Sequence, residues 1–318
     1  MTTMLRQMRD EPTNAAAWAV MALTPLFFAS NIVFGRWTVP DVAPFTLAFL
    51  RWGFVALLLA PFVVRAWHDA KGSRGLIAGL ALLGMAICGG GFYLALSFTT
   101  AINATLIYTT SPIFVLLIER TMGKPLSALR LLGCLVALLG VSAILLGNQT
   151  DRLSDMQLNW GDLGTLACAI AWAFYSILFR TPSLASLPAV ALFGMIAGCG
   201  ALILAPLALW EWTIGADMPT TTKAWTGIAG IVVFSSLVAF GGYQFGLRRF
   251  GPATTSVFMY LLPAYGVLMA VIFLGEAFEL HHAVGIVLVT GGVVLATRPR
   301  SRAVANAVLD RGVGPVSS

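Results

Sequence analysis

Ten long apolar stretches constrain the fold of this chain more than any other feature of the sequence. Each has about 17 to 24 residues and is almost free of charge, which is the pattern of a helix that crosses a lipid bilayer. Only Arg51, Arg130 and Asp162 interrupt these stretches. The chain is 58% hydrophobic and 10% charged, whereas a soluble domain is roughly 25% charged. The sequence therefore predicts an all-α membrane protein with ten transmembrane helices.

The expected spans form two groups of five, and no segment between them approaches the roughly 50 residues that a soluble domain needs. The first group covers 15–35, 44–64, 75–97, 101–118 and 128–147, and the second covers 161–179, 187–210, 224–247, 252–274 and 281–297. The predicted units are a tail over 1–14, a first repeat over 15–147, a linker over 148–160, a second repeat over 161–297 and a basic tail over 298–318.

Basic residues predict the orientation, because cytoplasmic segments of membrane proteins are enriched in Lys and Arg. With both termini in the cytoplasm, 15 basic residues lie on the cytoplasmic side and 3 on the outer side, and Arg51 stays within the membrane. The linker over 148–160 is then external. We expect a multi-pass protein of the cell inner membrane that contacts lipid and binds no nucleic acid, since no basic cluster is interleaved with aromatic residues on a soluble surface.

The two halves of the chain resemble each other at offsets that rise from 144 to 152 residues. Pro112 matches Pro263, and further along Gly133 matches Gly285. Because each half has five spans, the halves must cross the membrane in opposite senses. Inverted repeats of this kind are typical of secondary transporters, which bind substrate near the midplane between the repeats and work by alternating access.

Three short motifs accompany this repeat: the mid-helix prolines, the glycines that open spans five and ten, and the Gly275-Glu276 pair after span nine. With ten spans in two inverted halves, they resemble the drug/metabolite transporter superfamily, EamA type, over about residues 15–298. The resemblance implies transport of small molecules, and one bacterial member with a similar architecture exports aromatic amino acids. This chain departs from the motif in its first half, where Lys124 corresponds to Glu276.

One helical face on each of spans one and six carries polar or aromatic side chains. Thr24, Phe28 and Asn31 share a face of span one, and Trp172 and Tyr175 share the equivalent face of span six. Lipid offers no hydrogen-bond partner, so the polar groups are expected to point into the bundle. The two faces either join helices or line a substrate cavity, and we favour the cavity.

Tyrosines on other spans extend this hypothesis. Tyr108 and Tyr260 lie deep in their spans, where a hydroxyl that faced lipid would be costly. Tyr93 and Tyr243 lie nearer the ends, where tyrosines also form belts at the membrane boundary. Together with the two helix faces they predict a substrate site walled by aromatic rings. Pro112 and Pro263 each remove a helix hydrogen bond, so they are either static kinks or hinges of the transport motion.

Charged groups are scarce at mid-depth, which limits the mechanism. Proton-coupled pumps usually carry acidic or histidine groups within the membrane, and no Asp, Glu or His lies in the middle of an expected span. We therefore expect a facilitator that exports amphipathic metabolites, above all amino acids with aromatic or large apolar side chains. For Arg51 three roles stay open: reaching outward to water, pairing with Asp41, or binding a substrate carboxylate.

Other functions remain alternatives. A drug exporter or a different metabolite exporter of the same superfamily would have the same sequence features. A channel or an intramembrane enzyme is an alternative from another class, although no zinc-protease, P-loop or nucleophile-elbow motif occurs. No catalytic residue, metal site or cofactor is expected, and both a monomer and a homodimer agree with the sequence.

Overall fold

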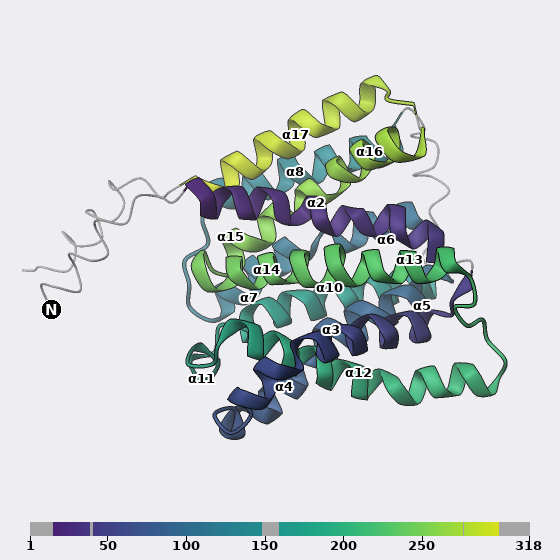
Figure 1. Cartoon of the computed structure of the whole chain (residues 1–318). Coiled ribbons are helices and arrows are strands. Elements are labelled where there is room, and N and C mark those ends of the chain that lie inside the picture. Colours follow the sequence, from purple (N-terminus) through teal and green to yellow (C-terminus); the bar gives the residue numbers. More distant parts are fainter. Residues whose placement is uncertain (1–14, 39–40, 148–158, 276, 299–318) are drawn as a thin grey trace, which may run out of the picture.

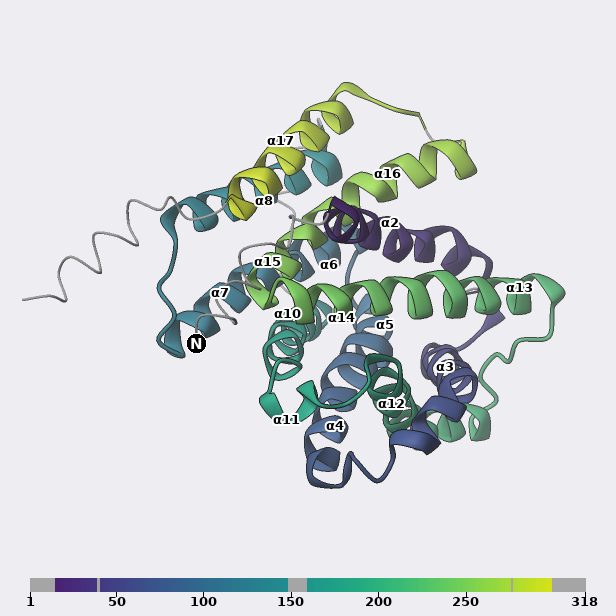
Figure 2. The same ribbon diagram turned by 60° about the vertical axis from the view of Figure 1, so that its left-hand side comes forward.

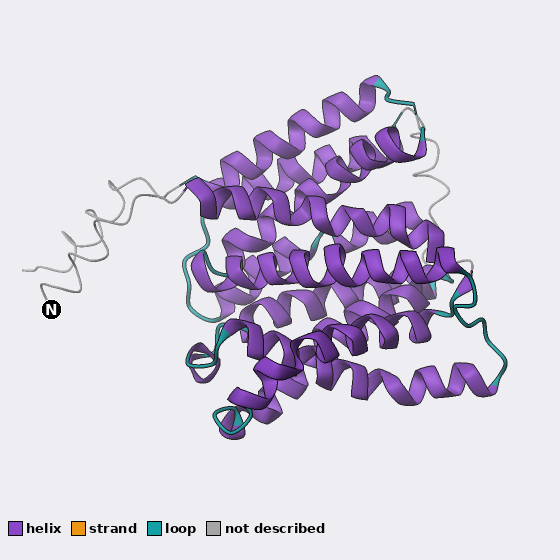
Figure 3. Ribbon diagram, viewed as in Figure 1, coloured by secondary structure: helices purple, strands orange, loops and turns teal. Residues whose placement is uncertain are grey.

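The computed structural model describes residues 15–38, 41–147, 159–275 and 277–298, and within these ranges every regular element is helical (Figure 1, Figure 3). Ten helical segments are long and apolar enough to cross a membrane. This confirms the predicted number of spans, and their ends agree with the predicted ends to about one turn of helix. The chain is thus a multi-pass membrane protein.

Each half contains five spans, of which the third and fourth are subdivided. The first half has α2 (Ala15–Thr38), α3 (Pro44–Ala66), α4 (Arg74–Ala81) with η3 (Leu82–Gly91) and α5 (Phe92–Leu96), α6 (Ala101–Tyr108) with α7 (Ser111–Thr121), and α8 (Ala128–Leu146). The second half has α10 (Trp160–Leu178), α12 (Ala189–Thr213), α13 (Thr222–Gly230) with η4 (Ile231–Val238) and α14 (Ala239–Arg249), α15 (Pro252–Val257) with η5 (Phe258–Tyr260) and α16 (Leu261–Leu274), and α17 (Leu280–Thr297). Two short helical turns, η2 (Lys71–Ser73) and α11 (Pro182–Ala185), lie in the connections before α4 and α12.

The same interruptions occur at equivalent places in both halves. Spans three and eight each contain a π-helical stretch, η3 and η4. Span four is interrupted at Thr109 and Thr110, and in span nine α15 passes through the 3-10 turn η5 into α16. Pro112 therefore lies in the first turn of α7, and Pro263 lies in the first turn of α16. Proline is tolerated there because the N–H groups in the first turn of a helix have no acceptor within the helix. The N–H that proline lacks is therefore not needed. The inverted five-helix repeat is therefore visible in local backbone structure as well as in sequence.

Glycines at matching positions of the two halves also explain how the last span of one half packs against the last span of the other. Helices α8 and α17 lie along one another at one edge of the bundle (Figure 2). Gly133 and Gly140 on α8 face Gly292 and Gly285 on α17, and a Cβ on any of the four would collide with the opposite helix. Small residues let two membrane helices approach closely, so this face of α8 is covered within the chain.

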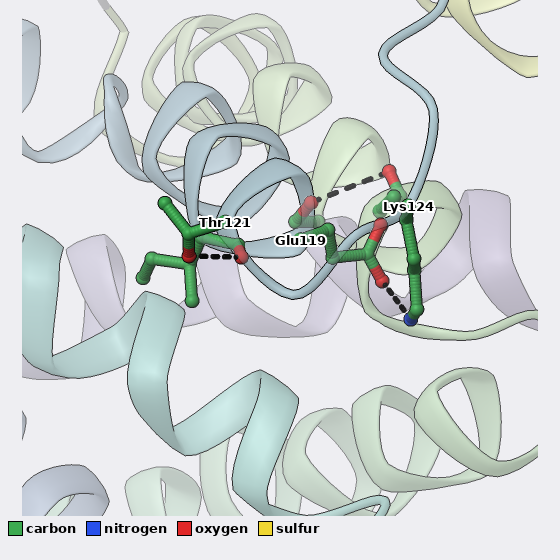
Figure 4. A network of polar contacts seen from close by, with 6 residues as sticks. Glu119, Thr121 and Lys124 are labelled. Carbon is green, nitrogen blue, oxygen red and sulfur yellow. Dashed lines mark hydrogen bonds and ion pairs between the residues drawn. The ribbon is translucent and has the colours of Figure 1, made fainter.

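A second pair of equivalent glycines ends spans four and nine. Gly123 and Gly275 both have left-handed backbone angles, with φ of 83° and 70°, a conformation in which glycine commonly ends a helix. After Gly123, the Lys124 ammonium donates to Glu119 Oε1 at 2.8 Å (Figure 4). Lys124 is therefore engaged in a local ion pair, while Glu276, its counterpart in the second half, lies outside the described residues.

Both described ends of the chain lie on the same side of the bundle, where α2 begins and α17 ends (Figure 1). An even number of spans requires this arrangement. The assignment of that side to the cytoplasm rests on the distribution of basic residues and remains a prediction. The predicted tail over 1–14, the predicted tail over 298–318 beyond Arg298, and most of the predicted external linker fall outside the described residues.

Candidate functional site

Spans one and six each pack against the π-containing span of the other half. Helix α2 lies along α13, η4 and α14, and α10 lies along η3. Glycines permit the close approach: Gly242 on α14 faces Thr24, and a Cβ on Gly84 of η3 would lie 2.8 Å from the ring of Tyr175. These contacts place both sequence-predicted helix faces at the boundary between the two repeats.

Five aromatic rings meet at this boundary, and we call them the aromatic cluster: Phe28, Trp172, Tyr175, Phe240 and Tyr243. The edge of the Phe28 ring approaches Phe240 with the ring centroids 5.2 Å apart and Trp172 with the centroids 6.4 Å apart. Trp172 in turn stacks on Tyr175 with centroids 5.3 Å apart and packs against Tyr243 with centroids 4.8 Å apart. The cluster joins α2, from the first half, to α10 and α14, from the second.

The tyrosine hydroxyls of the aromatic cluster are satisfied within the protein. The Tyr175 hydroxyl accepts from Gln244 Nε2 at 2.9 Å, and the Tyr243 hydroxyl shares a 2.7 Å hydrogen bond with the Ser176 hydroxyl. Tyr175 and Tyr243 have no exposed surface. Because their polar atoms are paired, these two rings can be buried without the cost of an unsatisfied hydroxyl.

Toward the other end of the bundle the polar groups are less well satisfied. Asn31 Nδ2 donates to the Tyr93 hydroxyl at the long distance of 3.4 Å, and Asn31 Oδ1 is buried without a partner among the described residues. Tyr108 packs on Phe92 with ring centroids 5.2 Å apart. Asn31, Tyr93 and Tyr108 are each only partly buried. These side chains therefore keep free surface and hydrogen-bonding capacity.

Arg51 lies beside this region, buried with 6% exposure. Its Nε donates to Ser236 Oγ at 2.6 Å, and its Nη2 donates to the Ser235 carbonyl oxygen at 3.1 Å. Arg51 therefore points across to η4 rather than outward to water. Asp41, the partner that the sequence left open, instead accepts a hydrogen bond from the Thr221 hydroxyl at 2.9 Å.

Tyr260 is the candidate residue that the structure places elsewhere. It belongs to a second buried cluster, with side chains such as Met21, Cys134 and Val289 from α2, α8 and α17. Its hydroxyl has no partner among the described residues. The 3-10 turn η5 precedes α16 and ends at Tyr260, so a count along a regular helix does not predict the direction of this ring.

Three residues of the site were absent from the sequence prediction. Phe240 touches Phe28 and Trp172, while Gln244 and Ser176 bind the tyrosine hydroxyls. Phe240 and Gln244 lie three residues before and one residue after Tyr243 on α14, and helical neighbours three residues apart share a face. The spacing was thus the available signal for Phe240, whereas nothing in the sequence linked Ser176 or Gln244 to particular tyrosines.

A pocket of about 400 Å³ opens between α6, α7 and α10. Its lining is mostly apolar: Ile107, Thr110, Ile113, Phe114, Asp162, Leu163 and Leu166. The carboxylate of Asp162 is already engaged by the Thr99 hydroxyl and by the backbone N–H of Asn159. None of the sequence-predicted site residues lines this pocket, so it is distinct from the aromatic cluster.

The sequence of the chain matches a known family in both halves. The model of the EamA-like transporter family matches residues 16–146 and again residues 159–298. A protein of Archaeoglobus fulgidus named as an uncharacterized transporter is 27% identical over 290 residues, which are 89% of this chain and 98% of that protein. The uncharacterized inner membrane transporter YedA of Escherichia coli strain K12 is 26% identical over 292 residues, which are 86% and 91% of the two chains.

The fold is also similar to one that has been solved. A structure described as "Crystal structure of protein" superposes with a TM-score of 0.72 and covers 93% of this chain and 99% of its own. The two sequences are 20% identical, so this likeness concerns the fold alone.

Proposed function

Because the chain belongs to the EamA-like transporter family, we propose that it is a secondary transporter that exports amphipathic small metabolites across the cell inner membrane. Amino acids with aromatic or large apolar side chains are the proposed substrates. Transport proceeds by alternating access and runs down the gradient of the substrate, without a coupled ion. The protein has no catalytic role in this proposal, and it works as a monomer or a homodimer.

The observation that carries this proposal is the aromatic cluster at the boundary of the repeats. Inverted-repeat transporters bind substrate near the midplane where the two repeats meet, and here that boundary is formed by Phe28, Trp172 and Phe240. Aromatic rings interact favourably with other rings and apolar side chains through their faces and edges. A substrate with an aromatic or large apolar body fits this composition.

Facilitated transport is supported by where the buried acids lie. Within the described ranges, Glu119, Asp162 and Glu211 are the buried carboxylates, and each lies in the first or last turn of its helix. Each is also bound by protein groups: Glu211, for example, accepts the backbone N–H groups of Phe45 and Thr46 at 3.0 and 2.7 Å. Carboxylates held in this way serve as helix caps and ion-pair partners and are poorly placed to carry protons through the membrane.

Alternating access is supported by unequal packing at the two ends of the aromatic cluster. Thr24, Tyr175 and Tyr243, toward the side where α2 begins, are 2% exposed or less. Asn31 and Tyr93, roughly 10 Å further along the membrane normal by the rise of a helix, remain partly exposed. We infer that the structure is closed on the side of the termini and more accessible from the opposite side, which is one end state of such a cycle.

Efflux from cells that overproduce the protein tests the proposed substrate class. Cells loaded with labelled phenylalanine should release it faster than cells with an empty vector, and the rate for labelled aspartate should not change. An apolar ring cluster with no basic group beyond Arg51 offers little to a second carboxylate. Faster release of aspartate or of a sugar, with phenylalanine unchanged, would contradict the proposed substrate while leaving the family assignment intact.

A further inference from the structure

Arg51 is a buried cation with no acidic partner in the part of the chain that the structure describes. Among the described residues, the Lys124 ammonium pairs with Glu119, and His281 Nδ1 lies 3.2 Å from Glu279 Oε2. Arg51 donates to the neutral groups of Ser235 and Ser236, and the Tyr93 side chain lies within hydrogen-bonding reach of it. A buried charge is costly unless it is both paired and hydrogen-bonded. This guanidinium is hydrogen-bonded, but it has no counter-charge among the described residues.

The remaining neighbours of Arg51 are aromatic. Its guanidinium carbon lies 4.7 Å from the centre of the Trp52 ring and 5.6 Å from that of Phe240. Tyr93 and Tyr108 are titratable side chains close to the guanidinium, and Tyr93 can accept a hydrogen bond from it. A guanidinium has five N–H donors in a planar fork that matches a carboxylate, and two serines do not exhaust them.

Arg51 is also continuous with the aromatic cluster and with Asn31. Phe240 contacts both the guanidinium and the ring of Phe28. Tyr93, which lies near Arg51, accepts the long hydrogen bond from Asn31. The neighbouring Asn31 Oδ1 is a buried acceptor that has no partner among the described residues. A cationic donor and an unused neutral acceptor thus flank the same group of rings.

We propose that Arg51 binds the carboxylate of the transported substrate, while Asn31 Oδ1 accepts a hydrogen bond from its ammonium group and the aromatic cluster holds its side chain. This inference rests on the proposed function and makes it specific: the preferred ligand is a zwitterion with an apolar body. The substrate supplies the counter-charge that the described residues do not offer to Arg51. The serines on η4 fix the guanidinium in place between transport events.

Ligand binding to the purified wild-type protein tests the proposal without any substitution. Thermal unfolding is measured with L-phenylalanine, with 3-phenylpropionate, which lacks the ammonium, and with phenethylamine, which lacks the carboxylate. A ligand that binds the folded state raises the unfolding temperature, and at equal concentration a tighter ligand raises it more, with the logarithm of its affinity. Phenethylamine should bind about 10- to 100-fold more weakly than phenylalanine, which is the range for loss of hydrogen bonds to a charged group. The affinity of 3-phenylpropionate should fall by a smaller factor.

Substitution of Arg51 provides the second arm. In Arg51→Gln the affinity for phenylalanine should fall by about the same 10- to 100-fold, whereas the weak affinity for phenethylamine should stay unchanged. Arg51→Lys keeps the charge but not the planar fork, so its affinity for phenylalanine should lie between that of the wild type and that of Arg51→Gln. Tighter or equal binding of phenethylamine by the wild type, or equal phenylalanine binding by wild type and Arg51→Gln, would overturn the assignment.

The two proposals fail in different ways. If phenylalanine and phenethylamine are exported equally well, the result supports the exporter function and contradicts the proposed role of Arg51. If phenylalanine binds through Arg51 but is not released from cells, the carboxylate site stands and the proposed export of amino acids falls.

Discussion

Among the site residues, Asn31 is the one whose replacement should lower the stability of the folded protein least. Its amide makes one hydrogen bond, of 3.4 Å, to Tyr93, and its Oδ1 has no partner among the described residues. Asn31→Leu keeps the branched shape and the number of side-chain heavy atoms, and it should leave the thermal unfolding temperature close to that of the wild type. Uptake of phenylalanine into liposomes should fall by about tenfold, the usual effect of losing one hydrogen bond to a charged ligand group.

Leu138→Ala on α8 is the control for this substitution. Leu138 packs at the edge of the second buried cluster, which contains Cys134 and Val289. Its truncation should lower stability by about 1 to 3 kcal/mol, less than for a fully buried leucine, and leave phenylalanine uptake per folded molecule unchanged. An equal loss of uptake in both variants would mean that Asn31 serves only packing.

Trp172 is less suitable for that experiment than its sequence position indicates. Its side chain is 5% exposed and touches Phe28, Tyr175, Phe240 and Tyr243. Truncation of such a residue to alanine costs about 3 to 5 kcal/mol, so a loss of transport could not be separated from unfolding. The sequence identified Trp172 as an unusual mid-span tryptophan, but its packing depends on residues of α2 and α14 that only the fold brings together.

At the scale of helices, the contact between α8 and α17 gives a matched pair of variants. A Cβ on Gly292 would lie 2.5 Å from the backbone N of Ala137, whereas a Cβ on the adjacent Gly291 meets nothing within 4 Å. Gly292→Ala should therefore lower stability by about 1 to 3 kcal/mol through overpacking. Gly291→Ala should leave stability unchanged or slightly higher, because alanine favours the helix.

Thermal unfolding in detergent measures both glycine variants. Ligand selectivity is the second readout, and it should be the same in the two proteins because neither helix contributes to the aromatic cluster. Equal stability of Gly291→Ala and Gly292→Ala would contradict the close packing of α8 on α17.

The spans themselves could be predicted from sequence because their ends are marked by charge and proline. Span two, for example, begins at Pro44 in the structure and is followed by the basic residues Lys71 and Arg74. The π-helical stretches could not be predicted, since the same apolar residues suit α and π turns equally. What distinguishes η4 is tertiary: the Ser236 hydroxyl donates to the Ile231 carbonyl and accepts from Arg51, a residue in the other half.

For the whole molecule, the inverted repeat was the part of the architecture that sequence alone revealed. Matched prolines and glycines carry it, and the structure adds equivalent helix breaks at the same places. The candidate site was only partly predictable. Phe28 and its repeat equivalent Trp172 do meet, and both contact Tyr243, but Tyr260 lies in a different cluster. The partner of Arg51 is set by the docking of two halves, which no local pattern encodes.

The proposed transport is the movement of an aromatic zwitterion down its own gradient. Its most direct test is the release of labelled phenylalanine from liposomes that contain the purified protein, with and without an imposed pH difference. Because the buried carboxylates of the described residues lie at helix ends and are already bound, we expect release at the same rate in both cases, saturating with phenylalanine concentration. Release that occurs only when a proton gradient is imposed would contradict the facilitator mechanism. If no phenylalanine is released under either condition, the result would contradict the proposed transport of aromatic amino acids.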